Sequence, residues 1–210
     1  MATGACIATL DTKGAELRYI RDLIRQRGHN TLVIDISTLG KPSFTPDITS
    51  REVARAAGKS LEEVRAYRSA GEASEIMTAG LVKIVGDLYA SGKLDGVIAI
   101  GGGMGTAMAT AAMRALPMGV PKIMVSPKVA QAGAQAFVGT KDVTIMPSVA
   151  DIEGLSSLMR KVLGNAAGAI AGMMEVATTL KGLPKKPTVV ISKLGTTTKC
   201  ALMVKPALEK

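Results

Sequence analysis

A glycine-rich segment carries the clearest signal for chemistry in this sequence. Four of five consecutive positions after a short apolar run are glycine, and a threonine follows them: Gly101, Gly102, Gly103, Gly105 and Thr106. Glycines let the backbone approach a phosphate closely, and the first turn of a helix offers free N–H groups with partial positive charge. The spacing matches neither GxGxxG nor the P-loop pattern, so the alternative is a tight strand-to-helix turn. Four glycines exceed what such a turn needs, and we therefore predict phosphate binding here.

A second candidate follows the first apolar run of the chain, residues 5–10. The next four residues are Asp11, Thr12, Lys13 and Gly14. Lys13 can neutralise a phosphate, and Thr12 can donate a hydrogen bond to it. The alternative is that Asp11 or Thr12 caps a helix while Lys13 lies in solvent. The capping interpretation is preferred for this segment alone, but beside a glycine loop at the same sheet edge the two are equally balanced.

Polar residues also follow other apolar runs. Asp35 lies at the end of the run 31–36, where an acid binds ribose hydroxyls in dinucleotide-binding folds, although the matching glycine pattern is absent. Ser126 ends the run 122–125 and is a further candidate for nucleotide contact. Ser148 and Asp151 precede a long helical stretch, and we expect them to cap it.

Several kinds of catalytic site are excluded or unsupported. The single histidine, His29, falls at a helix–strand turn on the amino edge of the predicted sheet, so we expect it to be exposed and a Ser–His–Asp triad is nearly excluded. No paired carboxylates stand out for acid–base work, and we predict no metal site. Cys6 and Cys200 lack CxxC spacing, and we expect both to be buried free thiols in a reducing cytosol. The residues therefore indicate no reaction type, and whether the protein is an enzyme stays open.

The composition narrows the class of partner. The formal net charge is +9, which fits nucleic acid, phosphorylated small molecules or an acidic protein partner. The positive charges are scattered and only 2% of residues are aromatic, so nucleic acid is the least favoured of the three. The chain shows neither a leader nor an apolar stretch of membrane-spanning length, and we expect a cytoplasmic location with no membrane contact.

Short apolar runs alternate with longer amphipathic stretches, which is typical of an α/β fold that is Rossmann-like and doubly wound around a mostly parallel sheet. Strands are predicted at 5–10, 31–36, 96–100, 122–125 and 143–146, and helices at about 15–27, 72–90, 106–116 and 156–180. Thr49 with Glu52, and Ser60 with Glu63, form two capping boxes that predict two short inserted helices.

The last third of the chain bears on domain organisation. The helix predicted at 156–180 lacks a polar face in its middle, so we expect burial on several sides and a homodimer. We assign residues 1–184 to a Rossmann-like nucleotide-binding domain. Residues 185–210 read as a strand at 187–192, a polar turn and a helix, which either begin a second domain or complete the first.

Six motifs occur together in this order: residues 8–14 (ATLDTKG), 46–48 (PDI), 100–103 (IGGG), 116–122 (LPMGVPK), 148–152 (SVADI) and 165–173 (NAAGAIAGM). Their combination resembles the tobamovirus-resistance-type ATP-binding domain family, which is also grouped among uncharacterised bacterial proteins. The resemblance covers essentially the whole chain. It departs from the family at Pro127, where a Thr is usual, and at Ser156, where an Asn is usual, so ligand contacts from residues 126–135 are not carried over.

The resemblance implies two Rossmann-like halves, ATP binding and dimers. The turn Gly195-Thr196-Thr197 is similar to the one that opens the second half of such proteins, so a separate chain carrying that half is a candidate partner. We therefore expect a nucleotide-binding domain for ATP, with Mg²⁺ as a possible companion. The alternatives are one subunit of a two-part enzyme acting on a small anionic metabolite, or an interaction module without chemistry.

Overall fold

The computed structural model describes residues 1–67, 69–128, 133–179, 187 and 189–209. Its centre is a five-stranded sheet in the order β2-β1-β3-β4-β5. The strands are β1 (Thr3–Ala8), β2 (Asn30–Asp35), β3 (Gly96–Ile100), β4 (Lys122–Ser126) and β5 (Thr144–Pro147). All four neighbouring pairs are parallel. The predicted α/β, Rossmann-like fold is therefore confirmed.

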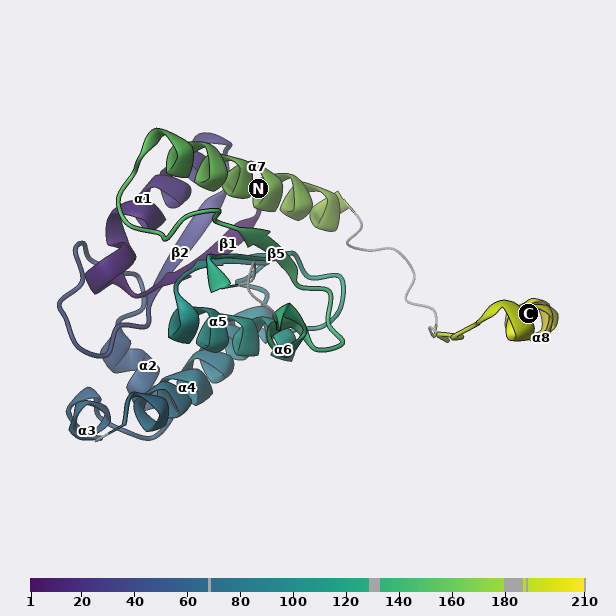
Figure 1. Ribbon diagram of the computed structural model, residues 1–210, viewed down its shortest axis with the longest axis horizontal. Helices are drawn as coiled ribbons and strands as arrows, with labels where there is room; N and C mark the ends of the chain where they lie inside the picture. The colour runs from purple at the N-terminus through teal and green to yellow at the C-terminus, as the bar shows by residue number, and fades with distance from the viewer. Residues whose placement is uncertain (68, 129–132, 180–186, 188, 210) are drawn as a thin grey trace.

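Helices cover both faces of the sheet (Figure 1). One face carries α1 (Leu10–Gln26) and α7 (Ser157–Thr179). The other carries α2 (Ser50–Ala56), α3 (Leu61–Ala66), α4 (Ala70–Ala90) and α5 (Gly103–Ala115). A short helix that the sequence did not predict, α6 (Ala134–Val138), contacts α5.

Two aliphatic cores fill the space between the sheet and its helices. Along β1, Ala5 and Ile7 belong to the core under α4 and α5, whereas Cys6 and Ala8 belong to the core under α1 and α7. This alternation follows from the two-residue period of a strand, and burial on both faces explains why the strands read as continuous apolar runs. Because the chain has few aromatic side chains to fill its core, helix α7 packs very close to the sheet. A Cβ on Gly96 of β3 would lie only 2.8 Å from Met174 Cγ of α7.

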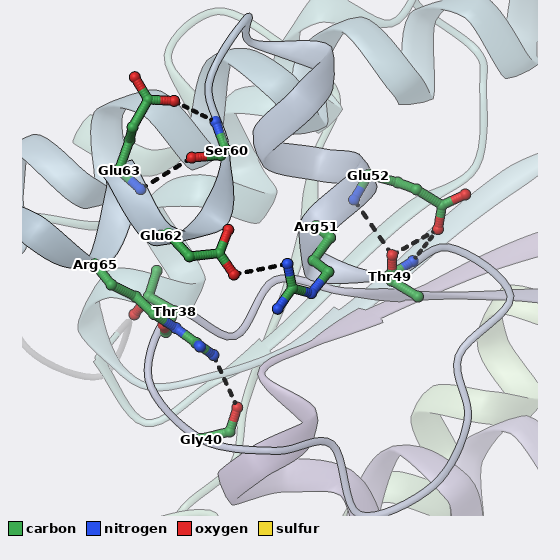
Figure 2. A network of polar contacts seen from close by, with 9 residues as sticks. All are labelled: Thr38, Gly40, Thr49, Arg51, Glu52, Ser60, Glu62, Glu63 and Arg65. Carbon is green, nitrogen blue, oxygen red and sulfur yellow. Dashed lines mark hydrogen bonds and ion pairs between the residues drawn. The ribbon is translucent and has the colours of Figure 1, made fainter.

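The two predicted capping boxes are present at the starts of α2 and α3 (Figure 2). Thr49 N–H donates to Glu52 Oε2 at 2.7 Å, and Ser60 N–H donates to Glu63 Oε2 at 2.7 Å. These backbone hydrogen bonds lower the pKa of both glutamates. The starts of the two helices inserted between β2 and α4 are therefore set by hydrogen bonds within the insertion itself.

The prediction for α7 needs correction. Its apolar residues are not distributed all round: Met159, Leu163, Ile170 and Met174 are buried in the chain's own core. The opposite face exposes polar groups, among them Arg160, Lys161, Asn165 and Glu175. Between Asn165 and Glu175 the helix carries no polar side chain, as the sequence predicted. Its outer face is nevertheless exposed there, at Ala169, so within this chain α7 is buried on one side and not on several. Its start is also different, because Ser156 Oγ accepts from Met159 N at 3.2 Å, while Ser148 and Asp151 lie in the preceding loop.

The C-terminal segment agrees in part. The predicted helix is present as α8 (Thr198–Leu208), preceded by a single 3₁₀ turn, Gly195–Thr197. The predicted strand at 187–192 is wrong for the residues that can be described there, 187 and 189–192, which lie outside any strand. No residue of α8 is buried, so Cys200 is exposed rather than buried as expected. Strand pairing needs a neighbouring edge, and sequence pattern alone does not supply one. In the part of the chain that is described, no helix combines the length and apolarity needed to cross a membrane.

Candidate functional site

A cavity of about 460 Å³ opens beside the carboxyl ends of β1 and β3. The chain turns from β1 to β2 on one side and returns to β3 on the other, so the strand order reverses between β1 and β3. Ligands of open α/β sheets bind at such a reversal, outside the carboxyl ends of the strands. The walls come from the first turns of α1, α4 and α5, the loop after β2, and the end of α3.

The glycine segment forms one wall of this cavity. Gly102 is the N-cap of α5, and Gly102, Gly103 and Gly105 line the cavity. A Cβ on Gly102 would meet nothing within 4 Å, and a Cβ on Gly103 would approach only the flexible end of Lys128, at 4.0 Å. Packing therefore does not demand glycine at these two positions. Gly101 is different, because a Cβ there would lie 3.0 Å from Gly105 Cα.

Thr106 and Ser126 lie outside the cavity lining. Both are fully buried, and their hydroxyl oxygens are 2.7 Å apart. Thr106 Oγ1 also donates to the carbonyl of Gly101 at 3.1 Å, and Ser126 Oγ accepts from Lys128 N at 3.1 Å. In this structure the two hydroxyls hold the glycine segment in place from the buried side, through the hydrogen bond from Thr106 to Gly101.

The first polar segment does reach the cavity, although it is already helical. Helix α1 begins at Leu10, and the backbone at Lys13 departs from helical geometry with φ −123° and ψ 19°. Asp11, Thr12 and Lys13 line the cavity. Thr12 Oγ1 lies 2.8 Å from Thr9 Oγ1, and Lys13 Nζ donates to the carbonyl of Ile152.

Asp11 has one oxygen engaged and one without a partner. Its Oδ2 accepts from Gly40 N at 3.0 Å. Its Oδ1 is buried and makes no hydrogen bond, and it is the one such side-chain oxygen or nitrogen found among the described residues. A buried acceptor without a donor is costly, and an ordered water, an ion or a ligand group can each complete it.

Two predicted residues have structural partners instead of a place in the cavity. Asp35 is 1% exposed, and its Oδ1 accepts from Leu10 N at 3.1 Å and from Ser37 N at 3.0 Å. This carboxylate caps the start of α1, which explains an acid at the end of β2. Gly14 is buried, and a Cβ there would lie 1.8 Å from Ser43 Oγ, so packing requires glycine.

The inserted helices supply a wall that the sequence reasoning missed. Arg65, at the end of α3, lines the cavity together with Thr38, Leu39 and Tyr67. Arg65 Nε donates to the carbonyl of Thr38 at 2.6 Å, and Nη2 donates to the carbonyl of Gly40 at 3.4 Å (Figure 2). The signal was present, because an insertion that directly follows a parallel strand starts at the carboxyl edge of the sheet.

The remaining reactive side chains lie elsewhere. His29 is 9% exposed, not solvent-exposed as expected, and its Nε2 lies 3.0 Å from Glu175 Oε1 of α7. The free thiol of Cys6 is buried, and desolvation raises its pKa to about 12, so it is inert as a nucleophile. Within the described ranges, no group of three or more His, Cys, Asp and Glu side chains is arranged to hold a metal ion.

Comparison with known proteins gives the relationship of the chain. The domain described as "Uncharacterised protein family (UPF0261) N-terminal domain" matches residues 3–179. A UPF0261 protein of Clostridium tetani is 41% identical over 204 residues, which is 97% of this chain and 50% of that protein. A UPF0261 protein of Mesorhizobium japonicum is 35% identical over 96% of this chain and 49% of its own length.

A plant protein is also similar. The ToMV susceptible protein tm-1(GCR26) of Solanum lycopersicum is 32% identical over 227 residues, covering 98% of this chain and 30% of that protein. The chain spans about half the length of the bacterial relatives it matches. The chain belongs to the UPF0261 family, whose N-terminal domain it contains, as the resemblance in its motifs predicted.

Proposed function

We propose that this chain binds a nucleotide, with ATP as the ligand, in the cavity between the carboxyl ends of β1 and β3. One observation carries the proposal. The glycine-rich start of α5 lines a cavity at the reversal of strand order, and two of its glycines are not required by packing. Backbone without side chains at the edge of a cavity lets a phosphate approach closely.

Different parts of the cavity wall suit different parts of a nucleotide. The N–H groups of Gly103 and its neighbours suit the phosphates, because they lie in the first turn of α5. Lys13 also lines the cavity and adds a positive charge. Leu39, Val64 and Met108 offer apolar surface for a base.

Asp11 suits a hard cation that accompanies the phosphates. Mg²⁺ bound with a nucleotide needs only one or two protein carboxylates, since phosphates and water fill its other positions. The partnerless Oδ1 of Asp11 matches that need. The metal would neutralise phosphate charge, and no reaction is proposed for the site.

Calorimetry with ATP, ADP and sugar phosphates tests the proposal. Heat of binding with ATP, together with a rise in melting temperature, is the expected result, because a ligand that binds only the folded state stabilises it. Neither heat nor a thermal shift with any nucleotide would reject the proposal.

A second candidate is one part of a two-part enzyme for a small anionic metabolite. Two cations that line the cavity, Lys13 and Arg65, favour an anionic ligand of either kind. The match to about half of the relatives' length makes a companion half relevant. Binding of sugar phosphates in the same titrations, with nucleotides silent, would favour this candidate.

We also propose a homodimer in the cytoplasm. Exposed apolar side chains of the C-terminal segment support the dimer: Val190, Leu194, Leu202 and Met203 are each more than half exposed. No residue of α8 is buried, nor is any described residue from 187 to 197. Exposed apolar side chains on such a segment favour association with another chain. Sedimentation equilibrium at micromolar concentration should give twice the mass of the 21.6 kDa chain, and a clean monomer would reject the dimer.

A further inference from the structure

Arg65 has hydrogen-bonding capacity left over on the wall of the cavity. A guanidinium group carries five N–H donors. The two hydrogen bonds that described residues accept from Arg65 use Nε and one donor of Nη2. Both acceptors are backbone carbonyls, so no negative charge in these bonds offsets the charge of the guanidinium. Within the described part of the chain no hydrogen bond from Nη1 or from the second N–H of Nη2 is found, and these donors can serve an anion.

The insertion fixes this side chain at the cavity. Helix α3 is held at its start by the capping box of Ser60 and Glu63. The nearby carboxylate of Glu62 pairs with Arg51 at 2.7 Å, across to α2, rather than with Arg65 (Figure 2). Arg65 in turn holds the loop after β2 through Thr38 and Gly40. The guanidinium therefore belongs to a connected arrangement and is not a freely rotating surface group.

The position of Arg65 matches the part of the cavity that a ribose would occupy. In nucleotide-binding α/β sheets the loop after the second strand lies against the ribose, where an acid accepts from a ribose hydroxyl or an Arg accommodates a phosphate on it. The acid at the end of β2, Asp35, is buried and already accepts several hydrogen bonds. Three charged residues line the cavity, Asp11, Lys13 and Arg65. Of these, Arg65 is the cation that donates hydrogen bonds to this loop.

We propose that Arg65 forms a second anion subsite, which adds affinity for a phosphate on the ribose to the binding of the 5′-phosphate group that ATP and other nucleotides share. This inference rests on the proposed nucleotide function and goes beyond it by naming the ligand class. The 5′-phosphate lies at the glycine segment, and the ribose phosphate accepts from the free donors of Arg65.

The experiment compares AMP with adenosine 2′,5′-bisphosphate and adenosine 3′,5′-bisphosphate by calorimetry, with ATP as a reference. At least one bisphosphate should bind the natural sequence about tenfold more tightly than AMP, the gain expected from one charge-assisted contact. Arg65→Ala should reduce this ratio to about 1. Arg65→Lys keeps the charge without the fork of donors and should retain part of it.

Arg55→Ala is the matched control, because it removes a positive charge from the same insertion at an exposed residue that does not line the cavity. It should leave the ratio unchanged. Melting curves check that each variant folds. A general loosening of the loop at Thr38 should weaken AMP and the bisphosphates alike, so the ratio of their affinities is unaffected by it.

Two results overturn the subsite: equal affinity for AMP and both bisphosphates, or a preference that survives Arg65→Ala. In either case binding of AMP and ATP would leave the proposed function standing. Absence of binding by every nucleotide would reject the proposed function and the subsite together.

Discussion

Thr106 and Ser126 share a buried hydrogen bond, with 2.7 Å between their hydroxyl oxygens, that joins the start of α5 to the end of β4. Thr106 also donates to the carbonyl of Gly101, immediately before the glycines that line the cavity. The shape of the glycine segment therefore depends on two side chains that lie beneath it. Their role in this structure is to position the backbone that we propose binds phosphate.

This arrangement predicts a coupled effect on stability. Thr106→Val should lower the free energy of unfolding by about 1–3 kcal/mol, because it leaves buried polar atoms at Gly101 and Ser126 with fewer partners. Urea denaturation measures the change. In a double-mutant cycle, the variant that carries both Thr106→Val and Ser126→Ala should lose less stability than the sum of the losses in the two single variants. Each single substitution already removes the same hydrogen bond. Fully additive losses would contradict a shared role.

Gly103→Val separates ligand binding from folding. A Cβ at this position would have only Lys128 Cε near it, at 4.0 Å, and we expect the fold to tolerate the substitution. We expect ATP binding to be lost while the melting temperature changes little. Gly101→Val is the matched comparison and should destabilise the fold, because its Cβ would press on the Gly105 backbone at 3.0 Å. A folded Gly103→Val protein with unchanged affinity for ATP would reject the assignment of this segment to phosphate.

Lys13→Ala tests the role of the lysine charge at the cavity. Lys13 is only partly buried, so its attraction for a phosphate should be screened by salt. We expect the loss of ATP affinity to be several-fold at low ionic strength and clearly smaller at about 0.5 M salt. Lys161→Ala, on the exposed face of α7, is the control of equal charge. A loss that does not vary with salt would indicate that the bond from Lys13 to the Ile152 carbonyl acts only in structure.

Acid should destabilise the protein in part through Asp142. Partial burial raises the pKa of this carboxyl, but the hydrogen bonds from Lys122 Nζ at 2.7 Å and Gly119 N at 2.7 Å outweigh it, and the pKa lies below its ordinary value. A depressed folded-state pKa contributes stability that is present above the unfolded pKa of about 4 and is lost as pH falls further.

Asp142→Asn removes that contribution. It should lower stability at pH 7 by about 2 kcal/mol, because Lys122 is fully buried and loses its carboxylate partner. Between pH 4 and pH 2 the variant should then lose less stability than the natural sequence. Urea melts across this range provide the comparison, and parallel losses in the two proteins would show that Asp142 does not contribute to the acid response.

Much of the fold could be predicted because local signals and burial agree. The β-strands are buried on both faces, and the capping residues Thr49 and Ser60 specify their helices by themselves. The site was predicted less completely. Asp35 was placed correctly at a strand end, yet only the structure shows that its carboxylate caps α1. Arg65 reaches the cavity through a tertiary arrangement of the insertion, which no pattern within α3 indicates.

The most direct test of the account follows the backbone amides of the glycines by two-dimensional ¹⁵N–¹H NMR during titration with ATP. We expect progressive shifts at Gly102, Gly103 and Gly105, which line the cavity, and little change at Gly58 and Gly92, which do not. Binding with shifts confined to other glycines, or no shifts at saturating ATP, would contradict a phosphate site at the start of α5.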